Sequence, residues 1–242
     1  MVDIHCHILP GIDDGSKSWE MTAQMCRIAA EDGITHIVAT PHSNDAYEYN
    51  RERYTEMLGQ LSDVADGRLT FSLGCDFHFS RDNIEDALEH PQRYTIGDSQ
   101  YLLVEFSDES VPPSVKRDLF AFSSRGLVPI ITHPERNPVL LKSAEMVMDF
   151  VEQGCLVQVT ANAVTGTWGG RSQKMLEWLL HREAVHVIAS DAHDPVYRQP
   201  VLSAARDIVS QLAGSSVADA LVNRNPAAII EGRPVPYQPM LR

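Results

Sequence analysis

The sequence has no apolar run that approaches the roughly 20 residues a helix needs to cross a bilayer. Asp3 and His5 interrupt the apolar residues directly after the start, so the N-terminus does not resemble a secretory signal. No low-complexity tract and no internal repeat is present. We therefore expect no membrane insertion and a cytoplasmic location.

Positive charge is also scarce. Lysine and arginine together number 20 against 33 aspartate and glutamate residues, which gives a formal net charge of −13 at pH 7. Such a charge disfavours a surface for nucleic acid and docking on anionic lipid. A phosphate ligand stays open, because bound metal ions can reverse the sign of the field locally.

Paired cysteines are absent. Cys6, Cys26, Cys75 and Cys155 are scattered and form no CxxC motif, so reduced thiols are expected. Cys75 and Arg81 do fit the C-x5-R spacing of cysteine-dependent phosphatases. In those enzymes small residues let the intervening backbone wrap the phosphate. Here that segment holds two phenylalanines, a histidine and no glycine, which disfavours a thiolate nucleophile.

Seven short runs rich in β-branched residues alternate with helical stretches. They cover residues 2–5, 34–40, 69–73, 101–104, 127–132, 156–159 and 185–190. This rhythm predicts parallel strands joined by crossover helices. The runs are almost continuously apolar, as expected of strands covered on both faces. A chain of 242 residues has room for one α/β barrel or two small domains. No linker divides it, so we expect a single domain over residues 1–242.

Helix signals fill the intervals between these runs. Side chains suited to cap a helix start stand at Ser18, Asn50, Ser80 and Ser143. The remaining helices are expected at residues 115–122, around 175–180, at 201–213, at 216–222, and from Asn225-Pro226 onward. A glycine-rich loop is expected between the sixth strand and the helix around 175–180.

The placement of polar residues favours a barrel over an open sheet. Histidines and carboxylates follow or end different predicted strands: His5, His7, His42, Asp76, Glu105, His133, Asp191 and His193. In a (β/α) barrel the carboxyl ends of the strands meet on one face, whereas an open sheet would spread them along an edge. We therefore predict an α/β fold with a TIM-like barrel of seven strands.

The first fifteen residues indicate the chemistry of that face. His5 and His7 are two apart, so in a strand both imidazoles point the same way. A carboxylate returns a few residues later in Asp13-Asp14-Gly15. An H-x-H pair alone is more often surface or packing chemistry. Because strands ending in His, Asp or Glu recur down the chain, a divalent metal site is favoured here.

Several motifs together resemble one family. They are His5-x-His7 with Asp13-Asp14-Gly15, Pro41-His42, Glu105-Phe106-Ser107, His133-Pro134-Glu135-Arg136 and Ser190-Asp191-x-His193. The chain resembles the PHP (polymerase and histidinol phosphatase) superfamily. Within it the motifs are similar to the metal-dependent bacterial tyrosine-protein phosphatases of capsular and exopolysaccharide operons.

The resemblance implies a distorted (βα)7 barrel and a trinuclear metal centre. By motif position the ligands would be His5, His7, Asp14, His42, Asp76, Glu105, His133, Asp191 and His193. Two positions depart from the family. Asp76 stands where glutamate is usual and is one methylene shorter, which leaves open whether it reaches an ion directly or through water. Thr160-Ala161-Asn162 replaces an Asn-Ser stretch, which leaves that wall of the pocket open.

The donor set agrees with transition-metal chemistry. Five imidazoles and four carboxylates suit Mn²⁺, Fe²⁺ or Zn²⁺ better than Ca²⁺ or Cu⁺. We expect three divalent ions, with Mn²⁺ first and Fe²⁺, Zn²⁺ or Mg²⁺ as alternatives. Nine ligands suffice for three ions only if one carboxylate bridges two of them, and Glu105 is the candidate.

These residues suggest a mechanism for phosphate-ester hydrolysis. A metal-activated water would attack phosphorus while Arg136 and Arg198 clamp the phosphoryl oxygens. A phenolate with a pKa near 10 leaves readily, so an aryl phosphate needs no strong general acid. The leading hypothesis is therefore a protein-tyrosine phosphatase that acts on a phosphotyrosine protein. The expected partner is a bacterial tyrosine kinase of polysaccharide synthesis or export.

Other functions stay open. One alternative is a small-molecule phosphomonoesterase such as histidinol phosphatase, and another is a catalytically silent PHP regulatory domain, whose mark would be missing ligands. Amide or lactone hydrolysis in an amidohydrolase-like barrel would usually need a carboxylated lysine. Lys142 and Lys174 occupy no strand end.

The remaining polar and aromatic residues near these motifs have weaker expectations. Asp13 is expected to shape its turn and not to bind metal. Structural or exposed positions are expected for His36, His78, His90, His181 and His186, with His78 the candidate for the pocket lining. A substrate groove formed by Tyr47, Tyr49 and Tyr54 is an open alternative to ordinary loop tyrosines.

Overall fold

The strands of the chain form two parallel sheets. The computed structural model describes residues 1–238, so the last four residues of the predicted domain lie outside the described part. One sheet has the order β1 (Val2–Cys6), β2 (His36–Ala39), β4 (Thr70–Leu73). The other has the order β3 (His42–Ser43), β5 (Asp76–His78), β6 (Tyr101–Glu105), β7 (Val128–Thr132), β8 (Leu156–Thr160), β9 (Val187–Ala189).

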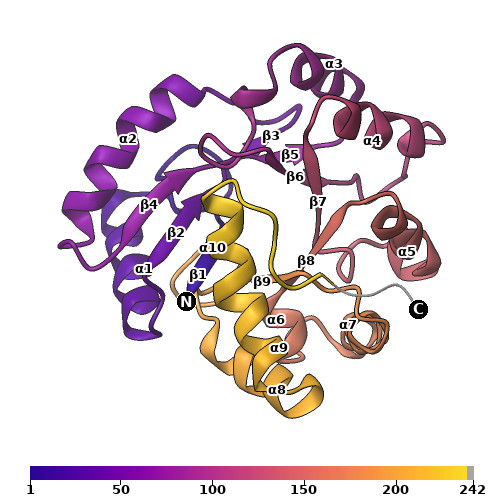
Figure 1. The fold of residues 1–242 in the computed structure, drawn as a ribbon. Coiled ribbons are helices and arrows are strands. Elements are labelled where there is room, and N and C mark those ends of the chain that lie inside the picture. The colour runs from indigo at the N-terminus through magenta and orange to yellow at the C-terminus, as the bar shows by residue number, and fades with distance from the viewer. Residues whose placement is uncertain (239–242) are drawn as a thin grey trace.

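The two sheets continue one another. β2 leads into β3 through Thr40 and Pro41, and β4 leads into β5 through Gly74 and Cys75 (Figure 1). At the other side, the Asp191 N–H donates to the His5 carbonyl at 2.9 Å, and the His7 N–H donates to the Ala192 carbonyl at 2.8 Å. Seven strand positions thus surround a common interior, which confirms the predicted α/β fold of parallel strands.

The second and third predicted strands are each broken, which the sequence reasoning did not expect. Pro41 has no N–H to donate to a ladder, so the pairing of β2 stops before it. At Gly74 an added Cβ would lie 3.1 Å from side-chain carbons of both Ile96 and Val38. The backbone there approaches its neighbours too closely for a larger residue. The pairing resumes between His42 and Asp76, at the level of the polar residues.

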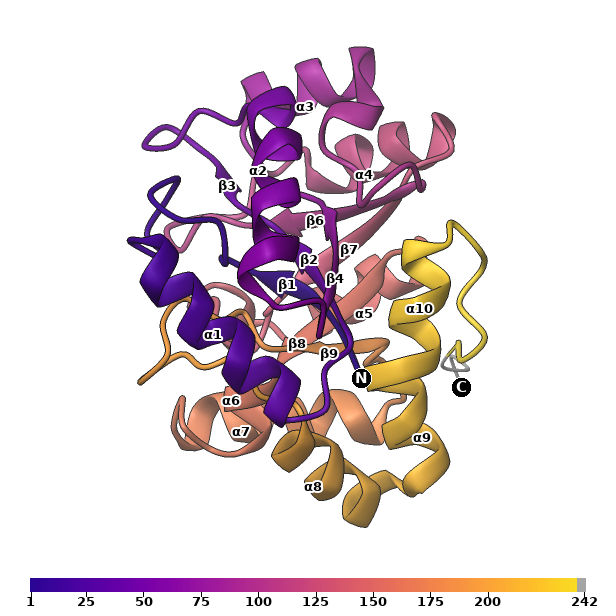
Figure 2. The ribbon, with the colours of Figure 1, turned by 90° about the vertical axis from the view of Figure 1, so that its left-hand side faces the viewer.

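Helices surround the strands, and the last helix lies across one end of their common interior (Figure 1). They are α1 (Trp19–Glu31), α2 (Arg51–Val64), α3 (Arg81–Glu89), α4 (Val115–Ser124), α5 (Glu145–Glu152), α6 (Ala161–Val164), α7 (Gly170–His181), α8 (Ser203–Ala213), α9 (Ser215–Asp219) and α10 (Asn225–Ile230). Short 3-10 turns lie at Pro91–Arg93 (η1) and Leu140–Lys142 (η2). α1 and α2 lie side by side outside β1, β2 and β4 (Figures 1 and 2). Among the described residues, no helix is both long and apolar enough to cross a membrane.

Three of the four predicted caps are confirmed. The side chains of Ser18, Asn50 and Ser80 each accept a hydrogen bond from the N–H three residues later. The prediction for Ser143 is wrong. Ser143 ends the short turn η2, and α5 begins two residues later without a side-chain cap.

Two other helix predictions need correction. The segment after the sixth strand, predicted as a loop, begins with the short helix α6, which Thr160 caps through its hydroxyl. The helix predicted at 216–222 ends at Asp219 in α-helical geometry. A π-helical stretch, Ala220–Arg224, then joins it to α10.

The interior of the strand ring is apolar toward the strand starts and polar at the strand ends. An apolar cluster inside it includes Ile4, Val38, Leu103, Ile130 and Val187 from five strands, together with Ile229 of α10 and Val235. Each strand member precedes a histidine or carboxylate along the chain. The cluster therefore closes one end of the ring, and the polar side chains gather at the other.

Candidate metal centre

The structure brings all nine predicted ligands to this polar end. Their donor atoms form three overlapping groups within 4.8 Å: His7, Asp14, His42 and His193; His5, His7 and Asp76; and His42, Asp76 and Glu105. The two remaining residues adjoin these groups. His133 Nε2 lies 3.7 Å from Glu105 Oε1, and Asp191 Oδ1 lies 3.5 Å from His5 Nε2.

Two carboxylates lie between pairs of histidines. Asp14 Oδ1 is 3.3 Å from His42 Nε2 and 3.4 Å from His193 Nε2. The two oxygens of Glu105 face different rings, Oε2 at 3.6 Å from His42 Nδ1 and Oε1 toward His133. This geometry is suited to a carboxylate that bridges two cations.

Asp76 lies deep in the cluster despite its shorter side chain. Its Oδ2 is 3.4 Å from His5 Nε2 and 3.3 Å from His42 Nδ1. Neither of its oxygens has a hydrogen-bond donor within the described part of the chain, although the side chain is buried. Because a buried carboxylate without a donor is costly, the site is suited to a cation there.

The two histidines of β1 are oriented by residues behind them. His5 Nδ1 lies 2.9 Å from Gln158 Oε1, and His7 Nδ1 lies 2.8 Å from Asp13 Oδ2. The two Nε2 atoms face the interior, 3.2 Å apart. In the neutral rings, with the Nδ1 protons donated to these oxygens, both Nε2 atoms could bind a cation. Such a partner fixes the tautomer and ring orientation of a metal ligand. Sequence reasoning missed Gln158.

Asp13 shapes its turn, as predicted, and it also contacts His7 and His42. Its Oδ1 accepts the Gly15 N–H at 2.9 Å, and its Oδ2 accepts the His42 N–H at 3.1 Å in addition to facing His7. A Cβ on Gly15 would lie 2.3 Å from the His7 carbonyl oxygen, so only glycine fits at this position. The Asp13-Asp14-Gly15 motif therefore folds tightly onto His7.

Two predicted ligands have strained backbones. His133 has a φ of +32° and Asp191 a φ of +52°, both in the region that favours glycine. Strained residues of this kind persist where the surrounding structure fixes them, and they concentrate at functional sites. The strain turns both side chains from the strand ends toward the cluster.

The charges of the cluster perturb its histidines in opposite directions. Burial by itself would lower the pKa of His5, but the carboxylates of Asp76 and Asp191 outweigh it and raise the value to about 9. For His42, the contacts with Asp14 and Asp76 overcome burial and raise the pKa to about 11. Burial, and to a lesser degree electrostatic repulsion from the neighbouring His193, lower the pKa of His7 to about 3.

Metal loading should therefore release protons. At pH 7 the metal-free cluster holds His5 and His42 in the protonated form, and both must be neutral to bind a cation. We expect about two protons to be released on loading, and metal affinity to rise as the pH increases from 6 toward 9. Calorimetric titration of Mn²⁺ in buffers of different ionisation enthalpy measures this release. Binding heats that do not depend on the buffer would contradict the expectation.

Arg136 and Arg198 lie beside the cluster and share one acceptor. Both donate to Asp191 Oδ2, Arg198 Nη2 at 2.6 Å and Arg136 through Nη1. Asp191 Oδ1 faces His5 and His193 instead. Burial would raise the pKa of Asp191, but His5 and the two guanidinium groups hold it far below its usual range.

Both arginines and most of the predicted ligands line one pocket of about 100 Å³. The lining residues are Asp14, His42, Asp76, Glu105, His133, Arg136, Asp191, His193 and Arg198. His5 and His7 are almost completely buried and lie behind this lining, within 4 Å of Asp76 and Asp191. A small, polar pocket with two cations at its edge is suited to an anion such as a phosphoryl group.

The alternative nucleophile finds no support. Cys75 is fully buried, and burial raises the pKa of its thiol well above the usual value. Arg81 points away, with its side chain 87% exposed and paired with Glu85. Lys142 lies in η2 and Lys174 in α7, away from every strand end.

Of the weaker candidates, His78 and Tyr47 lie beside the site. His78 Nδ1 lies 3.8 Å from Glu105 Oε2, beside the pocket but outside its lining. Tyr49 and Tyr54 are buried, and neither lines the strand-end pocket; Tyr49 borders a different pocket, described below. Tyr47 stacks on His42 with ring centroids 6.0 Å apart, so it borders the site.

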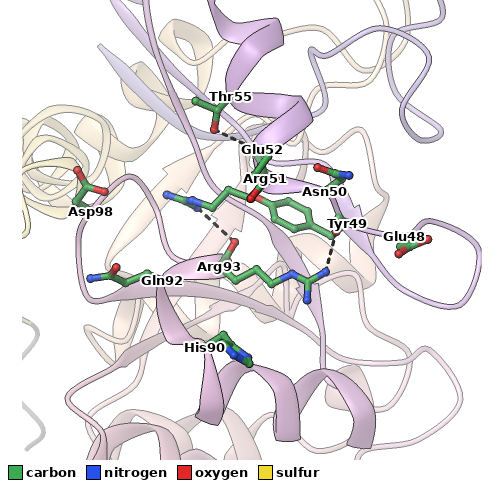
Figure 3. Close-up of a pocket in the computed structure, with 10 residues that line it drawn as sticks. All are labelled: Glu48, Tyr49, Asn50, Arg51, Glu52, Thr55, His90, Gln92, Arg93 and Asp98. Carbon is green, nitrogen blue, oxygen red and sulfur yellow. Dashed lines mark hydrogen bonds between the residues drawn. The ribbon is translucent and has the colours of Figure 1, made fainter.

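A larger pocket, of about 790 Å³, lies between α2 and η1 (Figure 3). Its arginines support the backbone. Arg51 donates to the carbonyls of Thr95 and Gly97, and Arg93 donates to the Tyr49 carbonyl. None of the nine predicted ligands lines this pocket. Its lining residues form no group of candidate metal ligands like that of the strand-end site.

Comparison with known proteins gives consistent matches. The family model for capsular polysaccharide synthesis, CpsB/CapC, matches residues 1–231. Tyrosine-protein phosphatase CpsB of Streptococcus pneumoniae is 30% identical over 239 residues, covering 95% of this chain and 98% of that protein. Tyrosine-protein phosphatase YwqE of Bacillus subtilis is 31% identical over 198 residues, with 80% and 78% covered.

Solved structures agree with the fold. A structure from work on YwqE of Bacillus subtilis and CpsB of Streptococcus pneumoniae, described as unique metal-dependent tyrosine phosphatases, matches with a TM-score of 0.91. The identity is 29%, and each chain is covered completely. Histidinol phosphate phosphatase of Lactococcus lactis matches with a TM-score of 0.58 at 10% identity, over 88% of this chain and 93% of that one. The second match shows a shared fold alone.

Proposed function

The chain belongs to the CpsB/CapC family of capsular polysaccharide synthesis, and from this premise we propose that it is a metal-dependent tyrosine-protein phosphatase. The observation that carries the proposal is the position of two arginines beside five imidazoles and four carboxylates at one end of the strand ring. The same nine residues would hold three divalent ions, with Mn²⁺ first and Fe²⁺, Zn²⁺ or Mg²⁺ as alternatives. When bound, the ions would supply Lewis-acid stabilisation and an activated water.

The charge balance favours a phosphate ester as the ligand. Three divalent ions bring +6 against −4 from the four carboxylates, which leaves +2 at the site. The two arginines add to this positive charge. A site of this sign would bind a phosphate dianion even in a chain whose formal net charge is −13.

Other residues would bind the phosphoryl group and position the metal ligands. Arg136 and Arg198 bind and orient the phosphoryl oxygens, and Asp191 holds both guanidinium groups at the edge of the pocket. Gln158 and Asp13 keep His5 and His7 in position. The leaving phenolate, with a pKa near 10, needs little help from a general acid.

The substrate is a phosphotyrosine protein, and a tyrosine kinase of bacterial polysaccharide synthesis or export is the expected one. The family's description as capsular polysaccharide synthesis supports this choice of process. Two exposed side chains beside site residues in the chain support a protein substrate. Val196 is 66% exposed and Tyr197 84% exposed, and they lie between His193 and Arg198 of the site.

A small-molecule phosphatase such as histidinol phosphatase is the second candidate, because it shares the fold. Turnover of a phosphotyrosine peptide, p-nitrophenyl phosphate and histidinol phosphate by the Mn²⁺-loaded protein distinguishes the two. A strong preference for histidinol phosphate would overturn the substrate class. If chelated protein recovers no activity with Mn²⁺ on any of them, a catalytically silent regulatory domain is favoured instead.

The exposed loop permits a sharper test of the protein substrate. The double substitution Val196→Ser and Tyr197→Ser should lower kcat/KM about tenfold for the phosphotyrosine peptide, because peptide contacts outside the pocket are lost. The loss for p-nitrophenyl phosphate should be much smaller. Leu212→Ser, which changes an apolar side chain 59% exposed on α8, is the matched control. Equal losses on both substrates would contradict a peptide-binding role for the loop.

A further inference from the structure

Trp168 lies against both arginines of the candidate site. The guanidinium carbon of Arg136 is 4.6 Å from the centre of its indole ring, and that of Arg198 is 5.9 Å away. Both distances are within the range of cation–π attraction. The two arginines also share Asp191 Oδ2 as acceptor. Each guanidinium group is therefore held between a carboxylate and an aromatic ring.

The loop that carries Trp168 is held in a defined shape. It joins α6 to α7, and Gly166 and Gly169 on either side of the tryptophan have φ values of +83° and +85°. The Thr167 N–H donates to the Asn162 carbonyl at 2.8 Å, and the Gly169 N–H donates to the Gly166 carbonyl at 3.0 Å. Two left-handed glycines and these bonds direct the indole inward to the rim.

The contact with the two guanidinium groups is the main polar interaction of the Trp168 indole. Trp168 is partly buried, and its Nε1–H is covered yet has no acceptor among residues 1–238. A hydrogen bond from the indole therefore does not explain its placement. Arginine side chains carry much rotamer freedom, so a planar face that fixes the guanidinium plane reduces what is lost on binding phosphate.

We propose that Trp168 is a positioning residue for the phosphoryl-binding arginines, fixing the guanidinium planes of Arg136 and Arg198 toward the pocket. This proposal rests on the proposed function, since it assigns the arginines to the phosphoryl group. Trp168 acts through the arginines, because it contacts both guanidinium groups and does not itself line the pocket. Sequence reasoning did not single it out.

Binding of inorganic phosphate to the Mn²⁺-loaded protein, measured by calorimetry, tests the proposal without relying on turnover. Trp168→Leu should weaken phosphate binding about tenfold, because the aromatic face is lost. Trp168→Phe keeps a smaller face and should stay within about threefold of the native protein. Metal content should be unchanged in both. With p-nitrophenyl phosphate the loss should fall mainly on KM.

A double-mutant cycle separates positioning from general packing. In an Arg136→Ala background, Trp168→Leu should weaken phosphate binding by clearly less than it does in the native protein. Trp178→Leu is the matched control. Trp178 lies on α7, and the guanidinium carbon of Arg182, the residue directly after this helix, is 3.8 Å from the centre of its ring. Neither residue lines the pocket of the site. This variant should leave phosphate affinity unchanged.

Each outcome decides the proposal. Equal losses with and without Arg136, or a loss for Trp178→Leu as large as for Trp168→Leu, would overturn it, as would native affinity in Trp168→Leu. The proposed function fails differently. In that case the native protein would turn over no phosphate ester, while the binding measurements on the variants would still report on Trp168.

Discussion

Replacing Asp191 with asparagine is expected to lower kcat/KM for a phosphotyrosine peptide by about a thousandfold, which corresponds to ~4 kcal/mol of transition-state stabilisation. The reason is that Asp191 serves both parts of the site. Its Oδ1 faces His5 and His193, and its Oδ2 accepts from Arg136 and Arg198. The neutral amide removes the charge that holds both. Metal content should fall together with activity.

The control for this substitution is Asp45→Asn. Asp45 is an exposed aspartate in the loop after β3, so the variant makes the same change of charge near the site without touching the cluster. It should retain native metal content and turnover. If Asp191→Asn kept both within a few-fold of the native protein, Asp191 would not be a ligand and the proposed site would be wrong there.

Replacing Arg136 with alanine is expected to lower kcat/KM by about a hundredfold to a thousandfold, the usual loss when one preorganised donor to a developing charge is removed. Metal content should stay at the native level, because the guanidinium group does not bind the ions. Arg136→Lys should recover little, since an ammonium group lacks the planar fork that binds two oxygens. Measuring activity and metal content on the same preparation tests both statements.

Arg171→Ala is the matched control for this prediction. Arg171 is exposed near the start of α7, and its loss should change neither activity nor metal content. A fall in metal content for Arg136→Ala would show that Arg136 maintains Asp191 in place and does not act on substrate directly. Native activity would remove it from the site altogether.

Eight of the nine predicted ligands could be found from sequence because they end or follow an apolar run, whereas Asp14 was implied by the family resemblance. The rule that parallel strands end on one face is enough to bring His5, Glu105 and Asp191 together, although they are far apart in the chain. The same rule explains why the two arginines Arg136 and Arg198 line the pocket at this face. Arg136 comes three residues after His133, and Arg198 five residues after His193.

The missed features depend on the packing of segments that the sequence does not relate to one another. Gln158 lies within a strand and has the pattern of an ordinary β residue, yet its side chain contacts His5 on β1, with β9 between the two strands. Trp168 follows a glycine-rich stretch that gives no helical or strand signal. The breaks after Ala39 and Leu73 arise from local backbone geometry, and strand periodicity does not detect breaks of this kind.

The departure at Asp76 is informative in the folded chain. The shorter side chain was expected to leave open whether its carboxylate reaches an ion directly. Its Oδ2 lies within 3.4 Å of the ring nitrogens of His5 and His42, and no donor among the described residues occupies either oxygen. This arrangement supports direct coordination as our proposal for Asp76.

The central claim is that the strand-end histidines and carboxylates bind a cluster of divalent cations. Anomalous X-ray scattering from Mn²⁺-loaded crystals, collected above and below the manganese absorption edge, tests it most directly. We predict three manganese peaks among the nine ligands, with Glu105 between two of them. A loaded crystal with no anomalous peak at this end of the strand ring, or with His5 and Asp191 turned away from every ion, would contradict the account.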